Sequence, residues 1–354
     1  MKTNETQTES QSPAPVMSGQ ELPGDWSEIS PEETLRVKSC HPVSLVNDLV
    51  RHNTGLVMPR LFAQELAHRI YNFELREDDI FILSYPKTGT TWTIELVWTI
   101  LNDVDIEKTK VPQMIRSPFL ESFCLVNTDF LTQLGLKPDN EKLCEVFDDP
   151  IEHANKMTGR RVIKSHLPLE FLPPRLLDTC KVIYVCRNPK DTAVSYYHHN
   201  LLVPGHSFIG TFQQFLQFFK EGLHTYGSYW QHLLGGWKNR THPNLKFLWY
   251  EDMKEDQMGV IEDLCTFLHH PLSAEQKETL VDHVKFSNMK KNPNTNPTAG
   301  VDLPPGKPDF IRKGQVGDWR NFFQEEESRL WDEWIREKIT ATGLEELHVF
   351  KTLK

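Results

Sequence analysis

The 354-residue sequence lacks several features that would narrow its function at once. No stretch approaches the roughly 20 consecutive apolar residues of a membrane-spanning helix, so we expect no membrane partner. Residues 1–16 are polar and lack the apolar core of a secretory signal, which indicates a cytoplasmic protein. The net charge of −10 argues against non-specific binding to nucleic acid. An anionic ligand would therefore have to be attracted by local lysines and arginines.

Metal and disulfide patterns are also missing. The six cysteines form no CxxC pair and have no histidine partners at zinc spacing. Such scattered cysteines indicate buried free thiols in a reducing compartment. The fifteen histidines show no metal-ligand spacing either, so we expect no metal site.

Composition divides the chain into two parts. Residues 1–31 are rich in Ser, Thr, Gln, Glu and Pro and show no periodicity, which predicts a disordered tail. Residues 32–354 alternate apolar β-type runs with helical patterns, which predicts a single α/β domain with a central parallel sheet flanked by helices. Within it we expect short helices over residues 32–73 and a loop or lid over residues 288–308.

Four apolar runs are the predicted strands: residues 80–83, 161–166, 181–186 and 245–250. The main predicted helices are residues 93–101, 170–177, 191–198, 211–235, 257–268, 274–284 and 324–340. Ligands of such folds bind at the carboxyl ends of the strands. Three of the four strands end there in basic residues or histidine, namely Lys87, Lys164 with His166, and Arg187.

Residues 85–92 (YPKTGTTW) join the first strand to the first helix. The N–H groups at a helix start have no intrahelical acceptor and the helix dipole is positive there, so a lysine and hydroxyls at this end favour an anion site. The Walker A order is not met, because Lys87 precedes Gly89. The alternative is an ordinary strand-to-helix turn with a threonine N-cap.

Enough basic residues are present to surround more than one anionic group: Lys87, Lys164, Arg187, Lys190, Arg312 and Lys313. Ser195 lies eight residues after Arg187 and can share one phosphate with it. Trp92 and Phe286 are candidates to stack on a base, with core packing as the alternative for each.

His166 is the titratable group best placed for proton transfer at neutral pH. It lies two residues after Lys164, so strand alternation puts both side chains on the same side. The alternative is a structural histidine. A kinase would need a Mg²⁺ ligand after a strand, whereas Asp191 and Asp252 are more typical of helix caps or ion-pair partners.

The motifs around these candidates resemble those of the cytosolic sulfotransferase family. Residues 85–92 look like its P-loop-like phosphosulfate loop, and residues 310–319 (FIRKGQVGDW) resemble its second signature. Similar motifs occupy residues 164–168, 187–198 and 249–254, and the likeness extends from about residue 56 to the last helix. The N-terminal extension resembles arthropod members of the family.

The resemblance implies 3′-phosphoadenosine 5′-phosphosulfate (PAPS) as sulfuryl donor and 3′-phosphoadenosine 5′-phosphate (PAP) as product. Lys87 and Lys164 would stabilise the transition state, and His166 would take the proton of the acceptor. The implied nucleotide-binding residues are Lys87, Thr88, Gly89, Thr90 and Thr91 at the 5′-phosphate, Trp92, Phe286 and Tyr250 at adenine, and Arg187, Ser195, Arg312, Lys313 and Gly314 at the 3′-phosphate. Phe119, His199 and His206 are the candidate residues of the acceptor pocket.

Three departures from the family pattern stand out. Val284 and Lys285 replace a Thr-Ser pair before Phe286, which alters part of the adenosine contact. His199 replaces an apolar residue, which predicts a more polar pocket. The family's dimer motif is degraded, so a homodimer of the usual kind is in doubt; the changed positions are Arg320, Gln324, Glu325 and Arg329.

The resulting prediction is sulfuryl transfer to a hydroxyl or amine of a small acceptor such as a phenol, catecholamine, sterol or other alcohol. One alternative is a dehydratase of the retinol dehydratase type, acting through a transient sulfated alcohol. The intact Pro86, Lys87 and Trp92 favour ordinary transfer over this alternative. Another is a non-catalytic nucleotide-binding module, against which the presence of both Lys87 and His166 argues.

Overall fold

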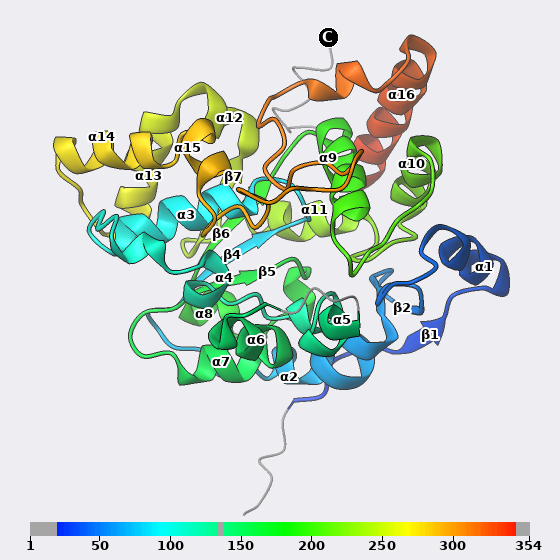
Figure 1. Ribbon diagram of the computed structural model, residues 1–354, viewed down its shortest axis with the longest axis horizontal. Coiled ribbons are helices and arrows are strands. Elements are labelled where there is room, and N and C mark those ends of the chain that lie inside the picture. Colours follow the sequence, from blue (N-terminus) through cyan, green and yellow to red (C-terminus); the bar gives the residue numbers. More distant parts are fainter. Residues whose placement is uncertain (1–19, 134–137, 345–354) are drawn as a thin grey trace, which may run out of the picture.

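The central element of the fold is a parallel four-stranded sheet with the order β5-β4-β6-β7 (Figure 1). Its strands are β4 (Ile80–Ser84), β5 (Val162–Ser165), β6 (Lys181–Cys186) and β7 (Leu245–Trp249). The computed structural model describes residues 20–133 and 138–344 of the chain. All five residues of β4 are buried, as expected for an inner strand with both faces covered. The predicted α/β fold with a central parallel sheet is confirmed.

Alternate residues of β4 enter two separate cores on opposite faces of the sheet. Ile80 and Ile82 belong to one core, Phe81 and Leu83 to the other. The first core lies under α3 (Thr90–Leu101), α13 (Gln257–Leu268) and α14 (Ala274–His283). The second includes α9 (Pro189–Leu202), α10 (Phe212–Glu221), α11 (Tyr229–Lys238) and α16 (Glu325–Thr342). Figure 1 shows the two groups of helices on either side of the sheet.

A small antiparallel sheet near the N-terminus corrects two expectations. It consists of β1 (Trp26–Glu28), β2 (Leu49–His52) and β3 (Val57–Pro59) in that order. Helix α1 (Pro31–Cys40) follows β1, and Ser30 and Glu33 form its capping box. Residues 20–31 are therefore not part of a tail, and residues 32–73 are not all helical. Strands of three or four residues are too short to show a periodic pattern.

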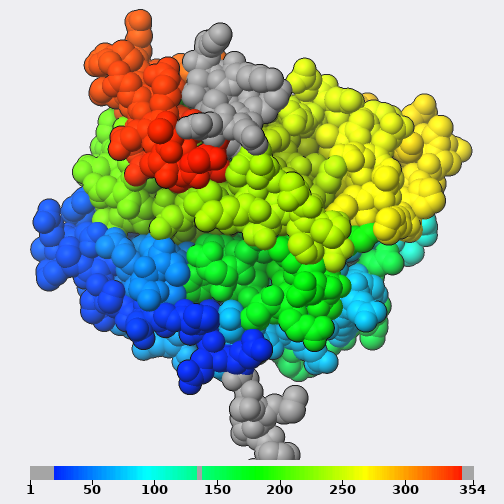
Figure 2. Space-filling view, turned by 180° about the vertical axis from the view of Figure 1, so that it is seen from behind, coloured from blue at the N-terminus to red at the C-terminus, as the bar shows by residue number. Residues whose placement is uncertain are grey.

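The expected tail otherwise lies on residues 1–19, which are outside the described residues. Seen from behind, the N-terminal part of the described chain lies against the rest of the domain (Figure 2). Ile29 and Val37 anchor it, since both are buried in the larger core.

Three further predictions needed correction. The segment 211–235 is two helices, α10 and α11, because α10 ends at Gly222 in the left-handed conformation with φ +66°. The expected helix over residues 170–177 is a 3-10 turn at Leu169–Phe171 followed by α8 (Leu176–Thr179). The expected loop over residues 288–308 begins inside α15 (Phe286–Lys291).

The remaining helices connect these layers. They are the π-helical turn Phe62–Leu66, α2 (Ala67–Tyr71), α4 (Gln113–Arg116), α5 (Thr128–Gln133), α6 (Glu141–Asp148), α7 (Pro150–Lys156) and α12 (Tyr250–Glu255), with 3-10 turns at Lys108–Lys110, Ser122–Cys124 and Asp318–Asn321. Across the described residues, no helix combines the length and apolar character needed to cross a bilayer. All six cysteines are free thiols.

Candidate active site

The loop between β4 and α3 leaves the start of α3 open. Gly89 is the N-cap residue and no side chain caps the helix, so the alternative of a threonine N-cap is wrong. Lys87 and Gly89 both have positive φ, at 71° and 121°. A Cβ on Gly89 would lie 2.8 Å from Tyr250 Cδ2, so only glycine fits here. The uncapped N–H groups can therefore serve an anionic ligand.

Two lysines from different strand ends come close together beside this loop. Lys87 Nζ lies 4.3 Å from the centre of the Phe310 ring, and Lys164 Nζ lies 3.8 Å from that of Phe119. Burial lowers the pKa of Lys87 to about 7 and that of Lys164 to about 8. The charges of Lys164, Arg187 and Arg312 add to the shift at Lys87. Positive charge concentrated in this way stabilises a bound anion.

His166 is held in the tautomer that a general base requires. Its Nδ1 lies 2.7 Å from the carbonyl oxygen of Ser84, to which it donates a hydrogen bond. The proton is therefore on Nδ1, and Nε2 has the free lone pair. Burial, reinforced by the charge of Lys164, holds the pKa of His166 well below its usual value. The ring is neutral at pH 7 and able to accept a proton.

The main chain of His166 is held from both sides by residues that the sequence motifs did not reveal. Its N–H donates to Glu121 Oε1 at 2.5 Å, and its carbonyl oxygen accepts from His232 Nε2 at 3.0 Å. The Tyr226 hydroxyl donates to the same Glu121 oxygen at 3.2 Å, and its ring contacts the His166 ring. Tyr226 does so with a strained φ of 77°. Together these contacts fix the position of the imidazole.

Glu121 reaches His166 because residues 117–121 run along β5. Lys164 N–H donates to Pro118 O at 2.9 Å, and Leu120 N–H donates to Lys164 O at 3.2 Å. The same path sets Phe119 against both Lys164 and His166, with 5.2 Å between the Phe119 and His166 ring centres. Phe119, a predicted acceptor-pocket residue, thus lies against the two residues predicted for catalysis.

The second cluster of cations joins β6 and α9 to residues 312–318. Arg187 Nη2 donates to Gln315 O at 2.8 Å, and Arg187 Nε is buried without a hydrogen-bond partner among the described residues. Arg312 and Lys313 both bind the carboxylate of Asp318, at 2.5 and 2.8 Å. These hydrogen bonds outweigh burial and lower the pKa of Asp318 to about 2.

Asp191 and Lys190 have structural contacts instead of the ligand roles considered for them. Asp191 accepts the N–H groups of Gly317 and Trp319 at 2.7 and 3.0 Å, which ties the 3-10 turn to α9. Lys190 is fully buried and pairs with Asp332 at 2.6 Å. The expectation that Lys190 contributes to the anion site is therefore wrong. Ser195 lies on the same helix and is half-buried.

Two of the predicted adenine residues, Trp92 and Tyr250, lie at the start of α3. Trp92 contacts Tyr250 edge to face at 5.7 Å, and its indole Nε1 is buried without a partner among the described residues. The guanidinium group of Arg187 stacks over the Tyr250 ring, with its central carbon 4.3 Å from the ring centre. Phe286 packs against the backbone of Gly314, where an added Cβ would lie 2.2 Å from the ring. An open helix start, two unpartnered donors and clustered cations fit a nucleotide with phosphates at both ends.

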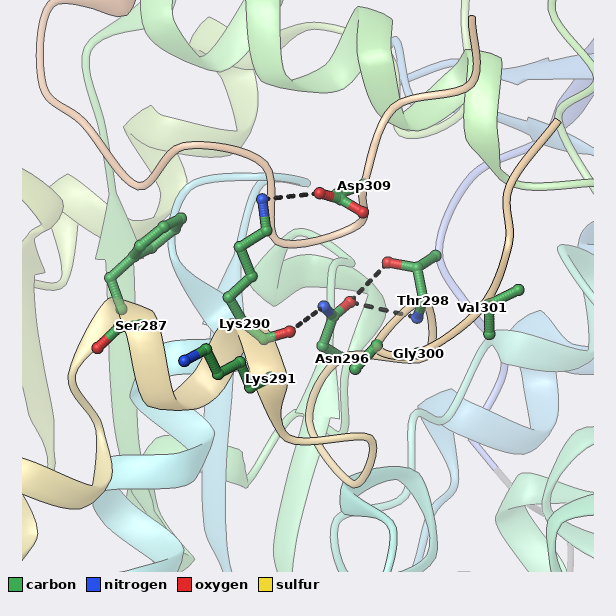
Figure 3. Close-up of a pocket in the computed structure, with 10 residues that line it drawn as sticks. Ser287, Lys290, Lys291, Asn296, Thr298, Gly300, Val301 and Asp309 are labelled. Atoms are coloured by element: carbon green, nitrogen blue, oxygen red, sulfur yellow. Dashed lines mark hydrogen bonds and ion pairs between the residues drawn. The ribbon is translucent and has the colours of Figure 1, made fainter. Parts of the chain in front are cut away.

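A groove of about 520 Å³ lies beside Phe286, between α15 and residues 296–309 (Figure 3). Lys290 of α15 reaches across it to Asp309 at 2.7 Å. The Asn296 side chain binds the Lys290 carbonyl oxygen at 2.6 Å and the Thr298 hydroxyl at 2.9 Å. The predicted lid is thus held in place by its own polar contacts.

Comparisons with known proteins agree with this geometry. The Sulfotransferase domain model matches residues 77–343. Luciferin sulfotransferase of Photinus pyralis is 35% identical over 290 residues, covering 79% of this chain and 76% of that protein. Human sulfotransferase 1E1 is 35% identical over 280 residues, covering 77% of this chain and 87% of that protein.

Solved structures give the same result. Retinol dehydratase in complex with retinol and PAP superposes with a TM-score of 0.79 at 33% identity, covering 90% of this chain and 97% of that chain. Mouse SULT7A1 complexed with PAP has a TM-score of 0.61 at 27% identity, covering 84% of this chain and 96% of that chain.

Proposed function

Because this chain belongs to the sulfotransferase family, we propose that it transfers the sulfuryl group of PAPS to a hydroxyl or amine of a small acceptor. The observation that carries the proposal is His166, with Nδ1–H bound to Ser84 O and a free Nε2 beside Lys87 and Lys164. Solved relatives contain PAP, which supports PAPS as the co-substrate. We place the protein in the cytoplasm, as its sequence predicts.

In this proposal His166 Nε2 removes the proton of the acceptor group as it attacks, and the Ser84 carbonyl stabilises the resulting imidazolium. PAPS supplies the sulfuryl group. Lys87 and Lys164 stabilise the negative charge that develops on the leaving phosphate, a role that divalent metal fills in phosphoryl transfer. The uncapped start of α3 binds the 5′-phosphate, while Arg187, Arg312 and Lys313 bind the 3′-phosphate with Ser195 and the Gly314 amide.

Adenine would be held by Trp92, Tyr250 and Phe286. The two acidic partners of this region, Asp318 and Asp191, orient the cations and the backbone that receive the 3′-phosphate. We propose no dimer of the usual family kind. Arg329, in place of an expected acidic residue, pairs within its own helix with Glu326 at 2.7 Å and with Glu333.

The direct test is incubation of the purified protein with ³⁵S-labelled PAPS and a panel of phenols, catecholamines, sterols and retinoids. We expect a labelled product with at least one acceptor. If PAP binds but none of the acceptors becomes labelled, the protein is a non-catalytic nucleotide-binding module and the proposal is wrong.

A dehydratase is the second candidate, because retinol dehydratase covers 90% of this chain at a TM-score near 0.8. In that reaction the C–O bond of the sulfated alcohol breaks, sulfate leaves, and a base takes a proton to form a double bond. Mass spectrometry of the retinol incubation separates the two candidates. A stable retinyl sulfate supports transfer, whereas anhydroretinol with free sulfate supports the dehydratase.

A further inference from the structure

Two histidines beside the proposed reaction centre differ from the other histidines around them. The rings of His199 and His206 lie 5.4 Å apart, and Nδ1 of each is buried without a partner among the described residues. His206 is 3% exposed, and His199 is half-buried on α9. A buried polar atom without a hydrogen bond is energetically unfavourable. Such a cost is recovered when a ligand supplies the missing hydrogen bond.

Neighbouring histidines show how satisfied ones look in this fold. His224 binds Tyr85 Oη through Nε2 and Thr225 O through Nδ1, at 3.0 and 2.8 Å. His232 binds Tyr184 Oη through Nδ1, at 2.6 Å, and the His166 carbonyl oxygen through Nε2. His41 binds the carbonyl oxygen of His206, at 2.6 Å. The rings of His199 and His206 form no hydrogen bond of this kind with the described chain.

The pair lies next to the groups that carry out transfer. The His199 ring is 5.8 Å from that of Phe310, and Phe310 is the ring over which Lys87 Nζ lies. Burial holds the pKa of His199 well below its usual value, and Lys87, Lys164 and His166 all act in the same direction. Burial also lowers the pKa of His206 to about 3. Both rings are therefore neutral at pH 7, and each can donate or accept a hydrogen bond.

We propose, building on the sulfotransferase function above, that His199 and His206 bind a second oxygen-bearing group of the acceptor. The acceptor is then an alcohol or phenol with a further hydroxyl or carbonyl oxygen, and not a purely apolar one. An ammonium group is disfavoured, because Lys87 and Lys164 already bring two positive charges to this region. The two histidines thus determine specificity, whereas His166 carries out the chemistry.

The test uses acceptors that differ only at the end distant from the sulfated hydroxyl. One series is 4-ethylphenol, 4-(2-hydroxyethyl)phenol and tyramine; the other is estradiol and its 17-deoxy analogue. In the series whose length fits the site, we expect the member with a second oxygen to exceed its apolar partner about tenfold in kcat/KM, the effect of one hydrogen bond. Tyramine should be no better than 4-ethylphenol. Equal or better use of the apolar members in both series, or preference for tyramine, overturns the proposal.

Two substitutions at each position show whether the histidines cause this preference. His199→Leu and His206→Leu remove the polar nitrogen, and the preference should fall to less than threefold. His199→Asn and His206→Asn keep a polar atom near the place of Nδ1, and much of the preference should return. If both kinds of variant keep the wild-type ratio of kcat/KM between the oxygen-bearing and the apolar acceptor, these histidines do not bind the second oxygen of the acceptor. His199 is half-buried, so we expect its variants to fold. They test the proposal even if His206→Leu fails to fold.

His270→Gln is the matched control, since His270 pairs with Asp103 at the junction of α3 and α13 and its loss should leave the ratio unchanged. Acceptor affinity is also measured by calorimetry in the presence of PAP, without turnover. A tenfold preference in affinity without any sulfated product would support the histidine proposal and refute the sulfotransferase function. Sulfated product without any preference for the second oxygen would support the sulfotransferase function and refute the histidine proposal.

Discussion

The proposed nucleotide side and the proposed acceptor side of the site are built differently. On the nucleotide side, cations follow strand ends or lie in residues 312–318, and some are already oriented, as when Asp318 binds both Arg312 and Lys313. On the acceptor side, neutral aromatic and histidine side chains come from α9 and from loops, and Glu121 and Tyr226 support His166 from segments about 100 residues apart. The first arrangement suits phosphate groups, which share one chemistry. The second can vary with the acceptor without disturbing the first.

Lys87 lies between the two sides, and apart from the loss of His166 its loss should have the largest effect. Lys87→Met should lower kcat about 10²- to 10³-fold, because one preorganised charge next to the breaking bond is removed. Steady-state kinetics with the best acceptor measures the change. Lys277→Met, at a lysine paired with Glu262 on the surface, is the control and should leave kcat as it is. A comparable loss in the control, or a loss below fivefold in Lys87→Met, would contradict this role.

Two carboxylates that accept main-chain N–H groups give a second comparison of the two sides. Glu121 accepts the N–H of His166 on the acceptor side, and Glu251 accepts the N–H of Asn188, at 2.9 Å, on the nucleotide side. Glu121→Leu should lower kcat about 100-fold with little change in PAP affinity, since a misplaced base loses much of its effect. Glu121→Gln keeps an acceptor oxygen and should restore most of the rate.

Glu251→Leu should act in the opposite way and weaken PAP binding more than it lowers kcat, because Asn188 is adjacent to Arg187. Titration calorimetry and kinetics on the same preparations separate the two effects. Parallel losses of rate and affinity in both variants would mean that these carboxylates serve only stability.

A change of pH should affect the nucleotide side by a smaller factor. Lys87 has a pKa of about 7 in the nucleotide-free protein, so it loses its charge as pH rises through 7, and an anion then binds more weakly. If PAP binds to the charged form of Lys87, the loss of this charge lowers PAP affinity about fivefold between pH 7 and pH 8. Calorimetric titration with PAP in two buffers should show that the protein takes up nearly one proton when PAP binds at pH 8. Lys87→Arg stays charged and should show neither effect; if it shows both, another group is responsible.

The smallest expected effect concerns the contact of Phe286 with Gly314. An added Cβ would lie 2.2 Å from the Phe286 ring, so Gly314→Ala should displace the ring and weaken PAP binding about threefold, since a ring stacking contact is worth about 0.5–1.5 kcal/mol. Gly300→Ala is the matched control, with φ +75° and open space around it. Equal affinities in the two variants would mean that Phe286 does not contribute to the adenine site.

The sequence predicted the strands and helices around residues 85–92 well because these elements depend on short continuous segments. The order of Lys87, Gly89 and Thr90 reflects backbone needs that are visible in the sequence, and β4, β6 and α13 lie where their patterns predict. Glu121 and His232 were missed, because only the tertiary fold brings them to His166. Lys190 was misassigned for a related reason: its side chain turns toward α16 and is buried there.

The most direct test of the central claim is the rate of sulfuryl transfer by His166→Ala, measured with ³⁵S-labelled PAPS at saturating acceptor together with the affinity for PAP. The account predicts that transfer falls at least about 10³-fold, in the upper range for loss of a general base, while PAP affinity changes less than twofold. A variant that keeps more than a tenth of the wild-type rate would contradict the role of His166 as the base and with it the proposed mechanism.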